Sequence, residues 1–342
     1  MCLSRLLLGL IMRQSYHLFK NGRFERDQNT LRVITEEGSG PHYLPVENVG
    51  SLYCHGQLDF NTRALDFLSQ QGIVMHVFNW QDYYAGTYMP RKSLVSGRST
   101  VDQALHYART AERLPIARAI VTGAAREMIS NVRYYARKQD GLTSIVDRIE
   151  ERLSAVPESD DVNTLRGIEG SIRSEYYSLF REVTPDSLPF IKREFRPPPN
   201  EVNSLISFGN SLLYSAILTE IYSTHLDPTI SYLHEPAERR YSLCLDLSEL
   251  FKPLIVDRLI FRLLNRKQIT EDDFDSGMNG CLLTTSGRRL FVREFEETLE
   301  RTVEHPTLKR HVSYQYLLRL EAYKLHKHVI GDKEYEPFKR WW

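Results

Sequence analysis

The N-terminal part of the chain is a succession of short apolar or β-branched runs separated by turn-forming residues. Asn-Gly at 21–22 and the stretch EEGSGP at 36–41 are typical of turns, so the runs between such breaks predict strands. One longer stretch, 61–72, has helical periodicity and ends at Gly72, where a C-cap glycine is expected. We therefore predict a small β-rich domain that contains one helix, with strands in the runs 16–19, 30–35, 49–54, 73–78 and 83–89.

Beyond Arg91 the apolar positions recur at helical spacing over long segments. The prolines 197–199 mark a stop, and Asn200 after them is a suitable N-cap for the next helix. This pattern predicts an α+β protein in which a β-rich domain, residues 12–90, is followed by a larger all-α domain, residues 91–342. The clearest helical segments are 101–110, 118–138, 144–153, 205–223 and 314–329.

The composition fits a globular protein of two domains, because 342 residues exceed the usual length of one. The 44 basic and 44 acidic residues balance, so the net charge does not indicate a nucleic-acid partner. Between residues 91 and 138, however, basic residues far outnumber acidic ones. They could neutralise DNA phosphates or form an ordinary solvated helix face, and the segment alone does not decide between the two. These basic residues are Arg91, Lys92, Arg98, Arg109, Arg113, Arg118, Arg126, Arg133, Arg137 and Lys138.

The stretch from Ser231 to Pro253 brings three potential metal ligands, His234, Asp246 and Glu249, into one short span. Imidazole and carboxylate groups suit a divalent ion such as Mn²⁺ or Mg²⁺. If the segment around the two acids is helical, they share one face, since they are three residues apart. A proline two residues after His234 favours a turn that returns the histidine toward this helix.

A third carboxylate, Glu169, is predicted on an amphipathic helix, next to its buried stripe. Gly167 and Gly170 flank it, and a glycine inside a helix costs about 1 kcal/mol relative to alanine. The pair therefore suggests that another helix or a nucleic-acid backbone approaches closely. Taken singly, each residue has another interpretation. Glu169 could be a solvent-facing glutamate, and His234 could bind no metal. The two acids of the later helix could simply stabilise the N-terminus of that helix.

Several segments together resemble successive motifs of the CRISPR-associated spacer-acquisition integrases, the Cas-one family. Their order and spacing match, and the likeness runs from about Met12 to the C-terminus. The segments are LRGIEGSIRSEYY, RPPPNEVNSLISFGNSLLY, LDPTISYLHEP, LDLSELFKPLIVDRLIFRLLNRKQI and VSYQYLLRLEAYKLHKHVIG.

The resemblance implies a function and a set of site residues. Carried over by motif, Glu169, His234 and Glu249 bind the divalent ion, and Asp246 is the neighbouring acid that supports the site. The family likeness also implies that the β-rich domain forms a homodimer, that the helical domain carries the metal, and that a Cas-two protein joins a hetero-oligomeric adaptation complex. The DNA substrates implied are a protospacer, whose 3′-hydroxyl attacks, and the CRISPR repeat that receives it.

The chain departs from the commoner family motif at Ser248, Leu250 and Lys252, where methionine, glutamate and arginine are usual. Lys252 keeps the positive charge but loses bidentate phosphate geometry. We predict DNA contacts by Lys252, Arg173, Arg258 and Lys267. Three of these residues have alternative roles. Arg173 could form a surface ion pair with the glutamate four residues before it. Arg258 and Lys267 could simply border the apolar stripe of their helix.

The four cysteines are far apart and contain no C-x-x-C pair, so neither a zinc site nor a disulfide framework is expected and a reducing cytoplasm fits. Arg5 and the apolar run after it look like a short signal-peptide core without a cleavage site, and the run is too short to span a membrane. Since the resemblance begins near Met12, we expect residues 1–11 to be an upstream extension of the translation start.

We therefore predict a metal-dependent DNA endonuclease and integrase of CRISPR adaptation. Two alternatives stay open at this point: a DNA-binding scaffold of the adaptation complex without catalytic activity, and a general nuclease that repairs branched DNA. Retention of all three ligand types argues against the scaffold, whereas the repair nuclease would use the same site.

Overall fold

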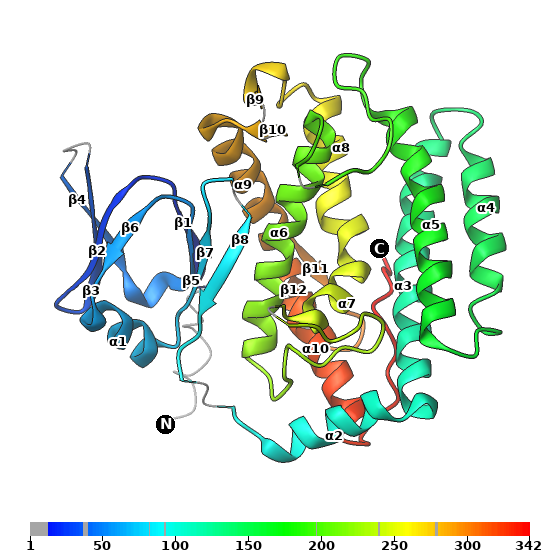
Figure 1. Cartoon of the computed structure of the whole chain (residues 1–342), viewed down its shortest axis with the longest axis horizontal. Coiled ribbons are helices and arrows are strands. Elements are labelled where there is room, and N and C mark those ends of the chain that lie inside the picture. The colour runs from blue at the N-terminus through cyan, green and yellow to red at the C-terminus, as the bar shows by residue number, and fades with distance from the viewer. Residues whose placement is uncertain are drawn as a thin grey trace. The chain divides into compact units, whose positions relative to one another are not determined.

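The computed structural model describes residues 13–36, 40–81, 83–91, 94–195, 197–238, 240–277 and 280–342. The predicted extension, residues 1–11, lies outside these residues. The chain divides into two compact units after residue 93, close to the boundary expected from the sequence. A β-rich unit therefore precedes a larger helical unit, as predicted (Figure 1).

The first unit is built from two four-stranded sheets. In spatial order, the strands of one sheet are β1 (Gln14–Leu18), β5 (Val49–Cys54), β7 (Val74–Phe78) and β8 (Tyr84–Tyr88). Those of the other sheet are β4 (Pro41–Pro45), β3 (Thr30–Thr35), β2 (Gly22–Asp27) and β6 (Leu58–Phe60). A 3₁₀ turn, Val46–Asn48, precedes β5.

The predicted runs all fall on strands, whereas β2, β4 and β6 were not singled out from the sequence. The reason lies in their sequences, because β2 (GRFERD) consists mostly of charged residues, β4 (PHYLP) begins and ends with proline, and β6 (LDF) has only three residues. Helix α1 (Thr62–Gln71) begins and ends as predicted. The Asn61 side chain accepts a hydrogen bond from the Ala64 amide, and Gly72 takes the left-handed conformation at φ 67°.

The second unit consists mainly of helices, as predicted, and adds two short β-ribbons. Strands β9 (Phe274–Gly277) and β10 (Gly280–Leu283) form one ribbon, and β11 (Thr302–Glu304) and β12 (His311–Ser313) form the other; a 3₁₀ turn, Glu271–Asp273, precedes β9. The helices are α2 (Gly97–Ala108), α3 (Thr110–Ala136), α4 (Thr143–Ser154), α5 (Val162–Val183), α6 (Glu201–Tyr222), α7 (Ser242–Phe251), α8 (Arg258–Asn265), α9 (Thr285–Glu300) and α10 (Tyr314–Val329).

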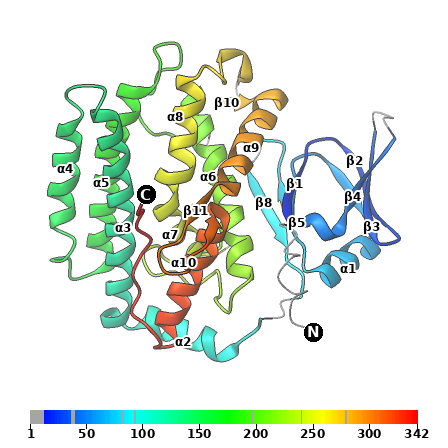
Figure 2. The same cartoon turned by 180° about the vertical axis from the view of Figure 1, so that it is seen from behind.

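Helix α6 runs through the centre of this unit and is apolar on nearly all sides (Figures 1 and 2). It begins at the predicted N-cap, where the Asn200 side chain accepts from the Asn203 amide. Its Gly209 lies against the π-helical segment η2 (Lys252–Asp257), because a Cβ there would meet Val256 Cγ1 at 2.7 Å. This close approach fixes η2, and with it the end of α7, against α6. None of the described helices has the length and apolar character needed to cross a membrane.

Candidate metal centre

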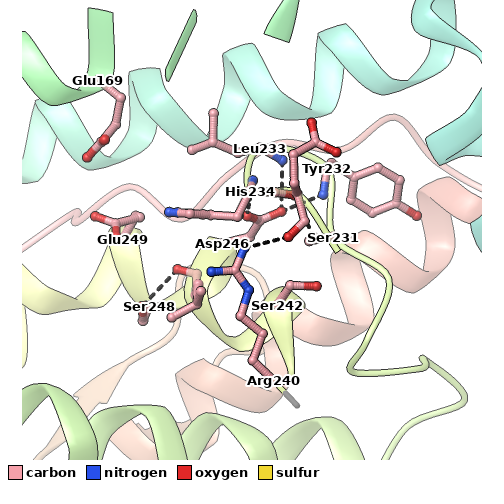
Figure 3. Close-up of polar contacts among 12 residues, drawn as sticks. Glu169, Ser231, Tyr232, Leu233, His234, Arg240, Ser242, Asp246, Ser248 and Glu249 are labelled. Atoms are coloured by element: carbon pink, nitrogen blue, oxygen red, sulfur yellow. Dashed lines mark hydrogen bonds and ion pairs between the residues drawn. The ribbon is translucent and has the colours of Figure 1, made fainter. Parts of the chain in front are cut away.

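Asp246 on α7 organises the turn that carries His234. Its fully buried carboxylate accepts hydrogen bonds from the backbone amides of Tyr232 (2.6 Å), Leu233 (3.0 Å) and His234 (2.9 Å). It also accepts from His234 Nδ1 at 2.9 Å (Figure 3). When the imidazole is neutral and donates from Nδ1 to this carboxylate, Nε2 keeps its lone pair. This is the arrangement by which a carboxylate orients a metal-binding histidine.

Residues of α2 and α3 hold the same turn from outside. Arg113 donates through Nε to the Tyr232 carbonyl at 2.7 Å and through its terminal nitrogen to Glu235 at 2.8 Å. Tyr107 donates to the other oxygen of Glu235 at 2.7 Å, and Gln103 donates to the carbonyl of Ile230 at 2.9 Å. Arg113 belongs to the predicted basic segment, but its role here is structural. The turn is therefore fixed before any ligand binds.

Glu169 on α5 and Glu249 on α7 point toward each other across the gap between these helices (Figure 3). Arg173 joins them, since its Nε donates to Glu169 at 3.1 Å and a terminal nitrogen donates to Glu249. Lys252 donates to the other oxygen of Glu249 at 2.6 Å. We call these four residues the glutamate half of the site, and the 231–234 turn with Asp246 the histidine half.

Burial changes the ionisation of the cations in the glutamate half. Burial opposes the charge of Arg173, but its interactions with Glu169, Tyr177 and Asp257 together outweigh burial and raise the pKa of the guanidinium above its ordinary value. Burial, aided by the charge of Arg173, lowers the pKa of Lys252 to about 8. Lys252 is therefore the cation that loses its charge more readily.

The predicted ligands come together in pairs rather than as a closed cluster. Within the described parts of the chain, no three His, Cys, Asp or Glu side chains stand close enough to enclose a metal ion. The reason is that Arg173 and Lys252 occupy oxygens of both glutamates. The donor set nevertheless fits Mn²⁺ or Mg²⁺, because it offers two carboxylates and an imidazole whose Nε2 is left as an acceptor.

The space beside Glu169 is open. A Cβ placed on Gly167 or Gly170 would meet no atom within 4 Å among the described residues, so no described helix approaches there. Of the two partners expected from the glycines, the other helix is thus not found in the described part of the chain. The open surface leaves room for a nucleic-acid backbone.

The remaining candidates for DNA contact have different surroundings. Lys252 and Arg173 lie in the glutamate half, as described above, and the ion pair expected between Arg173 and Glu169 is present. Arg258 begins α8, and Lys267 follows the end of that helix with a positive φ of 53°. Within the described residues, neither Arg258 nor Lys267 forms an ion pair with the candidate ligands. Their contact with DNA stays a prediction.

Comparison with known protein families agrees with the motifs. The family model described as CRISPR associated protein Cas1 matches residues 16–297. CRISPR-associated protein Cas1 1 of Methanobrevibacter ruminantium is 46% identical over 330 residues, which cover 96% of this chain and 99% of that protein. CRISPR-associated endonuclease Cas1 of Haloferax volcanii is 43% identical over 328 residues, with 96% and 99% covered.

Solved structures resemble the whole chain as well. A CAS1 protein from Thermotoga maritima has a TM-score of 0.85 and 41% identity, covering 95% of this chain and 100% of its own. A casposase bound to its integration product has a TM-score of 0.84 at 20% identity, covering 95% and 92%. A complex of Cas6-RT-Cas1 with Cas2 has a TM-score of 0.84 at 19% identity, and the match covers 96% of this chain and 36% of the other. The last two likenesses show the fold alone.

Proposed function

This chain belongs to the Cas1 family of CRISPR-associated proteins, and from that membership we propose that it is a divalent-metal-dependent DNA endonuclease and integrase. It inserts new spacers into a CRISPR array, the adaptation step of antiviral defence. The observation that carries the proposal is the hydrogen bond from His234 Nδ1 to Asp246, which leaves Nε2 as a free donor atom for a metal.

Glu169, His234 and Glu249 are the residues that would hold the ion, either Mn²⁺ or Mg²⁺. When bound, such an ion polarises a phosphodiester oxygen and stabilises the negative charge that develops during its attack. Asp246 would fix the tautomer and the orientation of His234 through its hydrogen bond with Nδ1. The role proposed for Asp246 is therefore orientation rather than direct binding.

Arg173 and Lys252 would position the DNA. Both donate to the ligand carboxylates here, so an ion that binds these carboxylates would compete with them and displace them. The guanidinium of Arg173 can then donate two parallel hydrogen bonds to a phosphate, and Lys252 can offer a single charge. Together they would hold the phosphodiester in line with its attacking hydroxyl.

The reaction conserves the number of phosphodiester bonds. The 3′-hydroxyl oxygen of the spacer attacks the phosphorus at the repeat boundary and loses its proton. One P–O bond forms while the bond to the departing strand breaks, and the departing oxygen takes up a proton. Hydrolysis results when water replaces the attacking hydroxyl.

The proposed partners follow from the family and from structures of similar proteins. The Cas6-RT-Cas1 structure described above is a complex with Cas2, and a further similar structure, with a TM-score of 0.58 and 17% identity, is a complex of TtCas1 with DNA. We propose that this chain likewise binds protospacer and repeat DNA, forms a homodimer through its β-rich unit, and joins Cas2. We place this assembly in the cytoplasm, where the DNA is.

The Glu169→Ala variant tests the proposed site. We expect Mn²⁺-dependent nicking of a plasmid and joining of a labelled 3′-hydroxyl oligonucleotide to fall at least about 100-fold, because loss of a ligand should cost no less than loss of its supporting residues. The fold should persist, since Glu169 is partly exposed and Arg173, its ion-pair partner, keeps its second carboxylate, Glu249. Glu182→Ala, at an exposed position on the same helix, is the matched control.

The same assay separates the alternatives. Unchanged nicking and joining in Glu169→Ala would remove the site assignment and favour the scaffold. Joining of a labelled protospacer to a repeat plasmid only when Cas2 is present supports the adaptation integrase. Cleavage of branched DNA that depends on neither the repeat nor Cas2 would instead identify a repair nuclease.

A further inference from the structure

A large basic cavity opens in the helical unit away from the candidate ligands. It has a volume of about 820 Å³ and lies among the end of α3, the segment from η2 through α8, and the C-terminal residues. Figures 1 and 2 both show the C-terminus between α3 and α8. Its lining includes none of Glu169, His234, Asp246 and Glu249, so it is a second site rather than an extension of the first.

The charge of this cavity is strongly positive. Eight arginine or lysine side chains line it, and no aspartate or glutamate is among the lining residues that the structure describes. Three of the eight form ion pairs with carboxylates outside the lining: Arg133 with Glu150, Arg262 with Glu294, and Arg340 with Glu127. The other five have no carboxylate within 4.0 Å in the described part of the chain, and these are Arg137, Lys138, Arg258, Arg266 and Arg301.

Two partly buried arginines of the cavity, Arg262 and Arg340, respond to this excess of charge. Burial lowers the pKa of Arg262, and the nearby charges of Arg301 and Arg266 lower it further. Burial also lowers the pKa of Arg340, and Arg258 adds to this effect against the opposing carboxylate of Glu127. An anion in the cavity would relieve this repulsion, since it stabilises each of the charged guanidinium groups.

An exposed aromatic ring stands among the unpaired cations. Tyr134 is 45% exposed, although it lies on the well-packed helix α3. The guanidinium of Arg258 lies 5.9 Å from the centre of its ring, and Lys138 Nζ lies 5.4 Å from it. A ring of this kind next to cations offers a surface on which a nucleobase can stack while its phosphates reach the positive charges.

We propose that this cavity binds a phosphorylated nucleotide, with its phosphates between Arg258, Arg266 and Arg301 and its base on Tyr134. The volume falls within the range of small-molecule sites. The same chemistry is offered by a free nucleoside polyphosphate and by the phosphorylated end of a single DNA strand. The proposal goes beyond the integrase function and does not depend on the metal site.

Binding of two probes tests the proposal. ATP represents the free nucleotide, and 5′-phosphorylated tetrathymidylate represents the strand end; calorimetry at about 0.1 M salt measures the affinity of each. We expect Arg266→Ala combined with Arg301→Ala to weaken binding at least about tenfold, because the two changes remove charged hydrogen bonds to the phosphates, which are stronger than neutral ones. Both side chains are exposed and lack a carboxylate partner among the described residues, so the fold should survive.

Matched variants locate the probe in the cavity. Arg181→Ala combined with Lys333→Ala removes the same charge from exposed positions outside the lining and should leave binding unchanged. Tyr134→Phe should keep the affinity and Tyr134→Ala should lose several-fold, since the ring and not its hydroxyl forms the stack.

The pattern of results decides between the two sources and can overturn the proposal. Cavity-dependent binding of ATP identifies a nucleotide site, and such binding of tetrathymidylate alone identifies a strand-end site. If neither probe binds, or if both double variants weaken binding equally, the proposal is wrong. Glu169→Ala should leave the affinity of either probe unchanged, so the outcome is independent of the test of the metal centre.

Discussion

The two halves of the candidate metal centre are held in different ways. In the histidine half, one buried carboxylate accepts four hydrogen bonds from a single turn, and three of these come from the backbone. In the glutamate half, two carboxylates on separate helices are held by the side chains of Arg173 and Lys252. Backbone donors are fixed by the fold, whereas long cationic side chains can turn away. The first half is thus preorganised, and the second is exchangeable.

The largest effect is expected from Asp246→Ala. The change leaves three backbone amides of the turn without their acceptor, so we expect the free energy of unfolding to fall by about 3–5 kcal/mol, together with loss of metal-dependent nicking. Urea denaturation measures the first and a plasmid assay the second.

Asp227→Ala is the control, because Asp227 also accepts from a backbone amide in the same loop, that of Thr229, but is only partly buried. We expect this variant to lose about 1 kcal/mol and to keep its activity. Equal destabilisation by the two changes would mean that Asp246 does not organise the turn, and the contrast between the halves would then be lost.

Local features of this structure were predictable from the sequence. The caps of α1 and α6 lie at Asn61, Gly72 and Asn200 because capping depends on residues within one turn of the helix end. The strands of the first unit that bury several residues, β3, β5 and β7, were identified as well. The ribbon β9–β10 was not, since β9 buries no side chain and its pattern carries no apolar alternation.

The candidate ligands were identified by their motifs, but their surroundings were not. Arg113 contacts Glu235 from 122 residues away in the sequence, and no spacing rule reports such a pair. The Arg173 bridge to Glu249 is equally remote, at 76 residues, although its contact with Glu169 four residues away was expected. Long-range contacts of charged side chains depend on helix packing, which the one-dimensional pattern does not fix.

A second prediction concerns the pH dependence of stability and a buried acid, Asp257, that interacts with the cations of the glutamate half. Asp257 is buried in the charge network of Arg173, Lys252 and Arg193, and burial raises its pKa from 3.8 to about 6. The folded protein therefore holds a proton that the unfolded chain releases between pH 4 and pH 6. The contribution of Asp257 to stability therefore falls as the pH rises through this window, by about 3 kcal/mol in total.

Asp257→Asn removes this titration. Urea unfolding at several pH values from 4 to 7 should show that the variant gains about 3 kcal/mol relative to the wild type as the pH rises. Asp186→Asn, at an exposed position, serves as the control and should follow the wild type at every pH. A constant difference between Asp257→Asn and the wild type would show that the folded and unfolded states bind this proton equally.

The smallest effect is expected from Arg173→Ala, which tests most directly whether an ion can replace the cationic side chains of the glutamate half. Without the guanidinium, Lys252 is the cation that still contacts Glu249, and the two glutamates repel each other more strongly. A divalent ion relieves this repulsion and should therefore stabilise the folded variant more than the folded wild type. We expect added Mn²⁺ to raise the unfolding midpoint of this variant by about 2–4 °C more than that of the wild type.

Two further variants separate exchange from a general effect of charge. Arg181→Ala removes an arginine from the same helix at an exposed position and should respond to Mn²⁺ like the wild type. Arg173→Ala combined with Glu169→Ala removes a carboxylate along with its cation and should abolish the added response. If Arg173→Ala and the wild type respond equally, the arginine does not compete with the ion. The glutamate half would then be as fixed as the histidine half, because its carboxylates would take the ion without first releasing a partner.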